Sequence, residues 1–294
     1  MPTQEFRSTN FRPDSLVRIG QINDILSEYP DQRLSARQIF YQLVSRAIIE
    51  NTVRSYKNTT NLLTDARYAG LVDWNVIEDH GRVPDHPSEW SSLESLVDAA
   101  LRGYRLPRWE GQENYVELWI EKQALAGVLA PIASKYHVTL MVNKGYSSCS
   151  SMKDAADRMI QAANDYAGDE DRRIVLLYCG DHDPSGEDMV RDIGARLEEF
   201  GVRNLDVRKL ALTMAQVEQF NPPPNPAKLT DSRAKGYIDK FGDSSWELDA
   251  LPPRELNRII ERAILGVLDV DKMGEVKARE EQDKERLRAA LKGM

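Results

Sequence analysis

The sequence predicts an α/β protein, with a mostly α-helical N-terminal module followed by a mostly parallel sheet that helices cover on both faces. Two observations support this fold class. From residue 115 onward, apolar strand-like segments alternate with amphipathic helix-like segments, a pattern typical of parallel sheets. Residues 12–69 instead carry three successive helical patterns.

The chain length of 294 residues favours about two domains. We expect a mostly helical N-terminal domain over residues 1–82 and a linker with one helix over 83–114. The sheet domain and its C-terminal extension then cover 115–268, and a charged helix or tail covers 269–294. Pro84, Pro87 and Pro107 mark the linker, because prolines interrupt regular elements.

Composition narrows the classes of function. Two cysteines allow neither a disulfide framework nor a four-cysteine zinc site. No apolar run approaches the roughly 18 residues of a membrane span, and the N-terminus lacks a signal-peptide core. We therefore expect a cytoplasmic protein without membrane contact. A net charge of -8 disfavours nucleic-acid binding through bulk charge, so such binding requires a local basic face.

The residue pattern of the N-terminal module predicts a winged helix. Apolar residues at helical spacing predict a first helix over residues 12–29. A second helix, capped by Ser35, is predicted to run to Ala47, and a third to cover residues 53–69. Residues 71–82 resemble a short strand pair that would form the wing. From Arg33 to Gly70 there are six basic and two acidic residues, a net charge of +4.

The polar side of the third helix is a candidate DNA-binding face. A helix that enters a groove uses such side chains for phosphates and base edges. A solvated helix face explains the same residues equally well. The candidates are Arg54, Lys57, Asn58 and Asn61.

The central feature of the second domain is the apolar run Ile174–Cys179, which suits a buried strand. Gly180 ends it, and Asp181 and Asp183 follow before a helix predicted over 187–200. Glu121 likewise follows a strand predicted over 115–120. The other predicted strands are 138–142 and 206–212, and the other helices are 123–135, 151–166 and 254–268.

Carboxyl ends of parallel strands meet at one edge of the sheet, where open α/β sheets bind ligands. Glu121, Asp181 and Asp183 should therefore form one acidic cluster. Oxygen ligands suit Mg²⁺, with Mn²⁺ as an alternative. A simpler interpretation is that the Asp-x-Asp turn caps the following helix. The metal interpretation is favoured because a cap needs only one carboxylate.

The second domain resembles a Toprim domain, the metal-binding module of topoisomerases, bacterial primases and several nucleases. The resemblance rests on Ile120-Glu121-Lys122 and on Asp181-His182-Asp183-Pro184-Ser185-Gly186. These motifs are most similar to the A subunit of topoisomerase VI and the related meiotic double-strand-break protein. Two other segments agree with that family in order along the chain: Arg37-Gln38-Ile39-Phe40-Tyr41 and Trp246-Glu247-Leu248-Asp249-Ala250-Leu251.

The resemblance implies that Tyr41 attacks a DNA phosphodiester and leaves a 5′-phosphotyrosyl link. Glu121 and Asp181 would be the more direct metal ligands, with Asp183 assisting. Arg37, one turn before Tyr41, could stabilise phenolate or phosphate. Lys122 and Lys144 border the same edge and could contact phosphate, or serve a structural role. Gln38 replaces the family's usual acid, which leaves the environment of Tyr41 less defined.

The family also implies a homodimer, because its tyrosine serves the other subunit's metal site. The chain has no Walker-type phosphate loop, so ATP use would require a separate subunit. Two other functions remain open. A Toprim nuclease of a defence system or mobile element would cut DNA with water activated by the metal. A DNA-binding accessory protein would not cut at all, and Tyr41 would then be a core aromatic residue.

Overall fold

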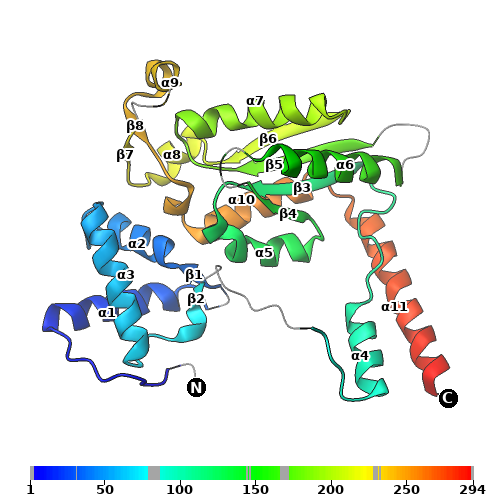
Figure 1. Cartoon of the computed structure of the whole chain (residues 1–294), viewed down its shortest axis with the longest axis horizontal. Coiled ribbons are helices and arrows are strands. Elements are labelled where there is room, and N and C mark those ends of the chain that lie inside the picture. Colours follow the sequence, from blue (N-terminus) through cyan, green and yellow to red (C-terminus); the bar gives the residue numbers. More distant parts are fainter. Residues whose placement is uncertain are drawn as a thin grey trace.

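A computed structural model of the chain describes residues 3–30, 32–78, 87–143, 145, 147–165, 172–227, 231 and 233–292 (Figure 1). Its centre is a four-stranded sheet in the order β4-β3-β5-β6, in which all neighbouring strands are parallel. The predicted parallel sheet is thus confirmed. The strands are β3 (Asn114–Ile120), β4 (Thr139–Val142), β5 (Arg173–Cys179) and β6 (Leu205–Ala211).

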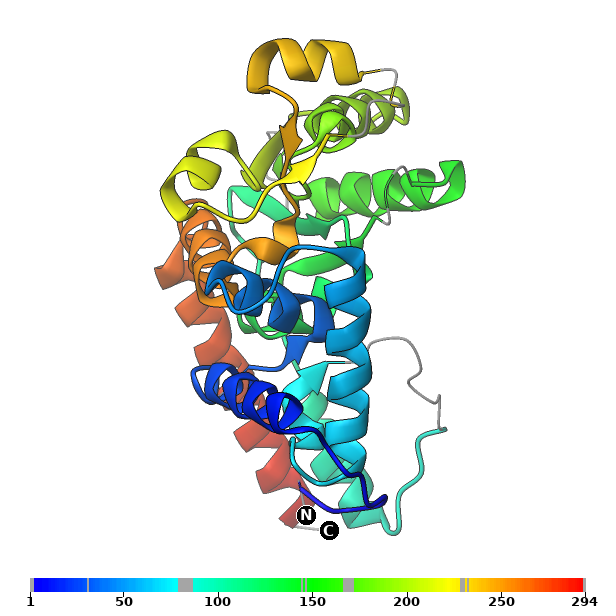
Figure 2. The ribbon, with the colours of Figure 1, turned by 90° about the vertical axis from the view of Figure 1, so that its left-hand side faces the viewer.

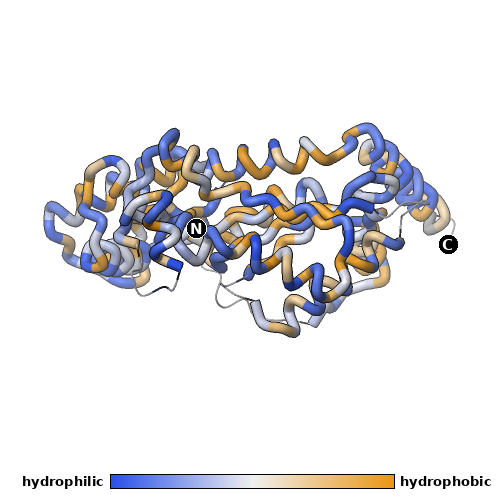
Figure 3. The backbone as a smooth tube through the Cα atoms, turned by 90° about the horizontal axis from the view of Figure 1, so that it is seen from above, coloured by the Kyte–Doolittle hydropathy of each residue, from blue (hydrophilic) through white to orange (hydrophobic). Residues whose placement is uncertain are grey.

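Helices cover both faces of this sheet, as predicted. On one face, α6 (Cys149–Asp165) and α7 (Pro184–Glu199) bury Met152, Met159 and Ile193 against β5. On the other face, 3₁₀ helix η2 (Gln123–Leu125), α5 (Ala126–Lys135), α8 (Met214–Phe220) and α10 (Pro253–Leu265) pack in a second core. Figure 3 shows apolar residues concentrated along the central strands. None of the described helices combines the length and apolarity needed to cross a membrane.

The N-terminal module contains the three predicted helices, α1 (Pro13–Ser27), α2 (Ala36–Ser45) and α3 (Val53–Tyr68). Ser35 caps α2 as expected: its hydroxyl accepts from the Gln38 backbone N–H at 3.2 Å, and the Gln38 side chain accepts from the Ser35 N–H at 2.9 Å. Gln38 is therefore part of a capping box with Ser35. At this position the family that the chain resembles usually has an acidic residue.

The predicted wing differs from the structure. The described part of residues 71–82 forms a 3₁₀ helix, η1 (Trp74–Val76), and a two-residue strand, β2 (Ile77–Glu78). This strand pairs in parallel with β1 (Leu34–Ser35), and residues 79–82 of the predicted wing lie outside the described residues. The local cause is Asp73, whose side chain accepts from the Asn75 N–H at 2.7 Å and starts the 3₁₀ turn.

The N-terminal module docks onto the sheet domain through α2 (Figures 1 and 2). Phe40 and Tyr41 pack with Ala250 of the 3₁₀ helix η3 (Leu248–Ala250). Asn51 donates through Nδ2 to the carbonyl oxygen of Pro224 and to Oδ1 of Asn225, both at 3.1 Å. The segment after β6 therefore contacts the N-terminal module.

Several short elements of this segment were not predicted. They are α9 (Ala234–Phe241) and the antiparallel pair β7 (Asn225–Pro226) and β8 (Ser244–Ser245), in addition to α8 and η3. The start of α8 does carry a sequence signal, because Thr213 and Gln216 form a capping box.

The linker helix α4 (Leu93–Gly103) and the C-terminal helix α11 (Val270–Lys292) lie side by side (Figure 1). The tail predicted over 269–294 is thus helical in its described part. Glu280, only 1% exposed, anchors α11. Its carboxylate accepts from Arg108 Nη1 at 2.7 Å, Lys284 Nζ at 2.7 Å and the Leu106 N–H at 2.9 Å.

We expect Glu280→Gln to destabilise the protein by about 3 kcal/mol, because it leaves the buried Arg108 without its counter-charge. Burial opposes ionisation of Glu280, but bonds from Lys284, Arg108 and the Leu106 N–H lower its pKa to about 2. This stabilisation is present above the unfolded pKa of about 4.3 and is lost as the pH falls towards 2. Thermal unfolding of both proteins across that range should show their difference shrink. Glu281→Gln, on the exposed side of α11, should change stability by less than about 0.5 kcal/mol.

Candidate functional site

Glu121 and Asp181 lie next to each other at the carboxyl edge of the sheet, although 60 residues separate them. The Asp181 backbone N–H donates to Glu121 Oε2 at 3.0 Å, and the Glu121 N–H donates to the Cys179 carbonyl at 3.0 Å. These contacts follow from the parallel pairing of β3 with β5, which ends at Ile120 and Cys179. The predicted convergence of these two turns is confirmed.

The Tyr178 hydroxyl lies within electrostatic reach of the three predicted acids. Burial raises the pKa of Tyr178, and the nearby negative charges of Glu121, Asp181 and Asp183 raise it further. The hydroxyl is buried and has no hydrogen-bond partner among the described residues. The three acids therefore act electrostatically on one buried hydroxyl.

Asp181 and Asp183 have different roles in their turn. Asp183 is the N-cap of α7, since its Oδ1 accepts from the Gly186 N–H at 2.7 Å and from Ser185 Oγ at 2.9 Å. The helix consequently begins at Pro184, earlier than the predicted Glu187. Asp181 caps no helix and instead accepts from the Leu248 N–H at 2.8 Å. The capping interpretation therefore applies to Asp183 alone.

The His182 ring lies between α9 and Glu187, whose Oε1 is 3.6 Å from His182 Nε2. Its Nδ1 lies 2.7 Å from the Tyr237 hydroxyl on α9, and its ring is 1% exposed. Its backbone exchanges two hydrogen bonds with Trp246, at 2.8 and 2.9 Å. This pairing brings the segment after Trp246 beside the Asp181 turn.

Glu247 and Asp249 join the site through that pairing, and neither was predicted as a site residue. Lys122 links them to Asp181: its Nζ lies 3.0 Å from Asp181 Oδ1, 3.0 Å from Glu247 Oε2 and 3.2 Å from Asp249 Oδ2. Lys122 is thus held by three carboxylates instead of lying free to contact phosphate. The only signal for the two acids was the resemblance of residues 246–251 to a family motif.

The cluster has more negative than positive charge. Three carboxylates, those of Asp181, Glu247 and Asp249, contact Lys122, and the last two also lie near Arg37. The Glu121 carboxylate adds a further negative charge beside Asp181. Burial raises the pKa of Asp181 to about 6, with Lys122 opposing and Glu121 adding to the rise. The Asp181 carboxylate is therefore undercompensated, a condition that a bound cation would relieve.

Arg37 connects α2 to this cluster. Its Nε and Nη2 donate to the two oxygens of Glu247 at 2.7 and 2.6 Å, and its Nε lies 3.6 Å from Asp249 Oδ2. Burial opposes ionisation of Glu247, but Lys122 and Arg37 lower its pKa. Arg37 is therefore paired with a carboxylate, and it also lies close enough to the Tyr41 hydroxyl to oppose the rise of the Tyr41 pKa, which agrees with the contact that the sequence suggested.

Tyr41 lies one helical turn from Arg37 and is 2% exposed. Its hydroxyl accepts a long hydrogen bond of 3.4 Å from Asn225 Nδ2. Burial raises the pKa of Tyr41, and the hydrogen bond from Asn225 opposes this rise. The hydroxyl borders a cavity of about 550 Å³. Tyr41 is thus a neutral phenol beside a cavity.

The candidate DNA-binding residues of α3 are all exposed, opposite the buried Thr59, Leu63 and Ala66. They are Arg54, Lys57, Asn58 and Asn61. Lys144 lies outside the described residues. This face of α3 is therefore exposed, and its role in DNA binding stays a prediction.

The donor set fits a hard divalent cation in its chemistry. Glu121, Asp181 and Asp183 supply only oxygen ligands. They act electrostatically on the Tyr178 hydroxyl, which has no hydrogen-bond partner among the described residues. As they stand, the carboxylates are engaged by backbone donors, and no three His, Cys, Asp or Glu side chains of the described residues are already grouped as metal ligands. Binding of Mg²⁺ would therefore require these side chains to turn.

Gly186 is required by the close approach of the Asp181 turn. A Cβ at this position would overlap the Asp181 carbonyl oxygen. We expect Gly186→Ala to destabilise the protein by about 1–3 kcal/mol, measured by denaturant unfolding. In Gly194→Ala, later in α7, the new Cβ would meet only Val207 Cγ2 at 3.7 Å. That control should gain about 0.5–1 kcal/mol, because alanine favours a helix.

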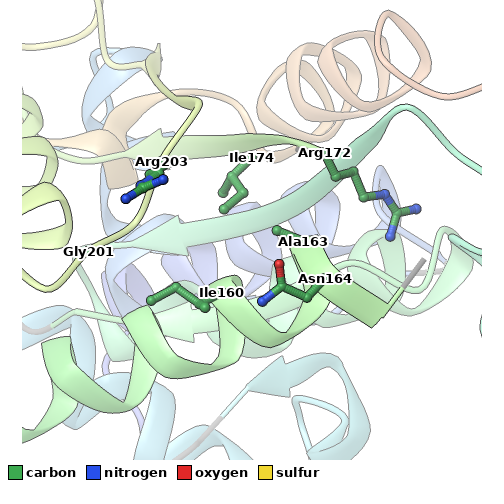
Figure 4. Close-up of a pocket in the computed structure, with 7 residues that line it drawn as sticks. All are labelled: Ile160, Ala163, Asn164, Arg172, Ile174, Gly201 and Arg203. Atoms are coloured by element: carbon green, nitrogen blue, oxygen red, sulfur yellow. The ribbon is translucent and has the colours of Figure 1, made fainter. Parts of the chain in front are cut away.

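A different hollow of about 280 Å³ lies at the opposite end of the strands, near the start of β5. Figure 4 shows Arg172 and Arg203 at its two ends, with the apolar Ile160, Ala163 and Ile174 between them. The separated cations do not converge on one ligand, and the hollow contains none of the predicted site residues.

No protein-family model matches this sequence, and no curated protein matches it.

Proposed function

We propose that this protein cuts DNA in a reaction that depends on a divalent metal ion, Mg²⁺ or Mn²⁺. One observation carries the proposal. Glu121 and Asp181 meet at the carboxyl edge of a parallel sheet, and the helix that bears Tyr41 docks onto the same acidic cluster through the pair of Arg37 with Glu247. The resemblance to Toprim proteins of the topoisomerase VI A type adds to this chemistry.

In the proposed reaction, the Tyr41 oxygen attacks phosphorus and the bond from phosphorus to the 3′ oxygen breaks. The phenol proton is lost and the departing 3′ oxygen gains one, so a 5′-phosphotyrosyl link and a 3′ hydroxyl result. The metal ion, when bound, stabilises negative charge that builds up on the phosphate oxygens. Glu121, Asp181 and Asp183 would hold it. Lys122 and Arg37 keep Glu247 ionised and fix α2 against the site.

A homodimer is part of this proposal. Among the described residues, the side chains that act on the Tyr41 hydroxyl are Asn225, Arg37 and Glu247, and none of these is a proposed metal ligand. In the family that this chain resembles, the tyrosine of one subunit serves the metal site of the other subunit. The exposed face of α3 would then contact DNA phosphates through Arg54 and Lys57. A separate ATPase subunit would be needed for strand passage.

A second candidate is a Toprim nuclease in which water is the nucleophile. The burial of Tyr41 and its raised pKa favour this alternative, because a phenolate is needed for attack. In that case the same three acids would hold the metal ion and Tyr41 would be a core residue.

Incubation of supercoiled plasmid with the protein and Mg²⁺ or Mn²⁺, followed by denaturation with and without protease, tests the proposal. Nicked or linear DNA that stays attached to protein until protease is added supports Tyr41 as nucleophile. Free ends without protease support hydrolysis. Binding without cutting that is unchanged by Glu121→Ala or Asp181→Ala would overturn both and favour an accessory protein.

A further inference from the structure

The cavity beside Tyr41 has the dimensions and lining of a ligand site. Its volume of about 550 Å³ lies within the range of roughly 300–1,000 Å³ for small-ligand pockets. It opens between α2, α3 and the segment that contains Asn225 and Glu247. The proposed cutting reaction uses Tyr41 at its edge but gives the rest of the cavity no role.

Flat groups form much of the cavity wall. The Phe40 ring lies 5.2 Å from the Tyr41 ring and 5.3 Å from the Tyr56 ring, measured between centroids. The Arg37 guanidinium carbon lies 5.6 Å from the Tyr56 ring centroid. The Phe40 and Tyr41 rings are buried and pack edge-to-face with their neighbours, so the half-buried Tyr56 ring, with the Arg37 guanidinium beside it, is the planar surface on which a nucleobase would stack.

Two carboxamides provide a polar edge to the same cavity. Asn51 donates to Asn225 at 3.1 Å, and Asn225 donates to the Tyr41 hydroxyl at the long distance of 3.4 Å. The second bond is weak and easily exchanged for a ligand. Carboxamides pair well with the mixed donors and acceptors of a nucleobase edge.

Charge distinguishes a base from a phosphate as the occupant. Both oxygens of Glu247, which lines the cavity, are bonded to Arg37, so this cation is already neutralised. The phosphate that Tyr41 attacks would lie at the cavity edge. A phosphate further inside would meet the Glu247 carboxylate, whereas a neutral planar ring there would not be repelled. The exposed Arg54 and Lys57 flank the lining residues Val53 and Tyr56 on α3. They could hold the backbone of the same strand outside the cavity.

We propose that this cavity binds one unpaired nucleobase of the DNA that the protein contacts. The inference rests on the proposed action on DNA and adds recognition of an extruded, mismatched or terminal base. Removing a base from a duplex costs less when the base is mismatched. The cavity should therefore make the protein prefer duplexes that contain a mismatch.

Binding of fluorescent duplexes in the presence of EDTA tests this preference without cutting. The native protein should bind a duplex with one central mismatch roughly tenfold or more tightly than the fully paired duplex. Val53→Trp fills the cavity mouth from a side chain that is 73% exposed, and should reduce this ratio to about one. Asn225→Ala, which removes the polar edge, should lower the ratio as well.

Val17→Trp is the matched control, because Val17 is 63% exposed on α1 and outside the cavity. It should keep the native ratio. Equal binding of both duplexes by the native protein, or a ratio that survives both Val53→Trp and Asn225→Ala, would overturn the base pocket. The test of cutting is independent of this one. A preference for mismatched DNA without any cutting would support the base pocket and contradict the proposed reaction. Cutting without that preference would support the reaction and contradict the base pocket.

Discussion

We expect Glu121→Gln to lower metal-dependent DNA cutting by roughly 10³-fold or more. The change keeps the size of the side chain and its acceptor for the Asp181 N–H, but removes one negative charge from the metal-ligand set. Metal-ion catalysis contributes several kcal/mol, and about 4 kcal/mol corresponds to this factor. Initial rates of plasmid cutting at saturating Mg²⁺ measure the effect.

Glu113→Gln is the control for this experiment. Glu113 is exposed and directly precedes β3, so it lies at the far end of the strand that Glu121 follows. Its substitution should leave the rate unchanged. Native-like cutting by Glu121→Gln would show that this carboxylate takes no part in the reaction.

The second large effect is expected for Tyr41→Phe, which should abolish the covalent protein–DNA product. Removal of a nucleophile typically costs about 10⁴-fold or more in rate. Folding should be nearly unaffected, because the hydrogen bond of the hydroxyl with Asn225 is long, at 3.4 Å, and Arg37 keeps its stronger pair with Glu247. Denaturing gels that detect labelled DNA bound to protein measure the product, and thermal unfolding checks stability.

Tyr29→Phe tests whether any buried tyrosine of the N-terminal module has the same effect. Tyr29 is 7% exposed and its ring faces Arg254, away from the cavity. This variant should retain the covalent product. If Tyr41→Phe still cuts and leaves free ends, water is the nucleophile and the hydrolytic alternative replaces the transesterification.

The sheet and the meeting of Glu121 with Asp181 could be predicted because they depend on local patterns and one topological rule. The apolar run before Gly180 is a strand, Ile120 ends another, and parallel strands place their carboxyl ends together. Nothing further is needed to bring the two turns side by side. The separate role of Asp183 as a cap was also among the interpretations of the turn.

The environment of these acids could not be predicted in the same way. Lys122 meets Glu247 and Asp249 because the backbone of Trp246 pairs with His182, a contact between loops far apart in sequence. No periodic pattern encodes such a pairing. The strand pair expected after residue 70 differs for a local reason in its described part, residues 71–78, since the Asp73 side chain favours a 3₁₀ turn at Trp74.

Binding of Mn²⁺, followed by electron paramagnetic resonance, tests most directly whether the acidic cluster holds a metal ion. The native protein should bind Mn²⁺, and Mg²⁺ should compete for the site. Asp181→Asn and Glu121→Gln should each weaken binding by at least roughly tenfold, while Glu113→Gln should not. Equal Mn²⁺ binding by all four proteins, or no binding by the native protein, would contradict the proposed metal site.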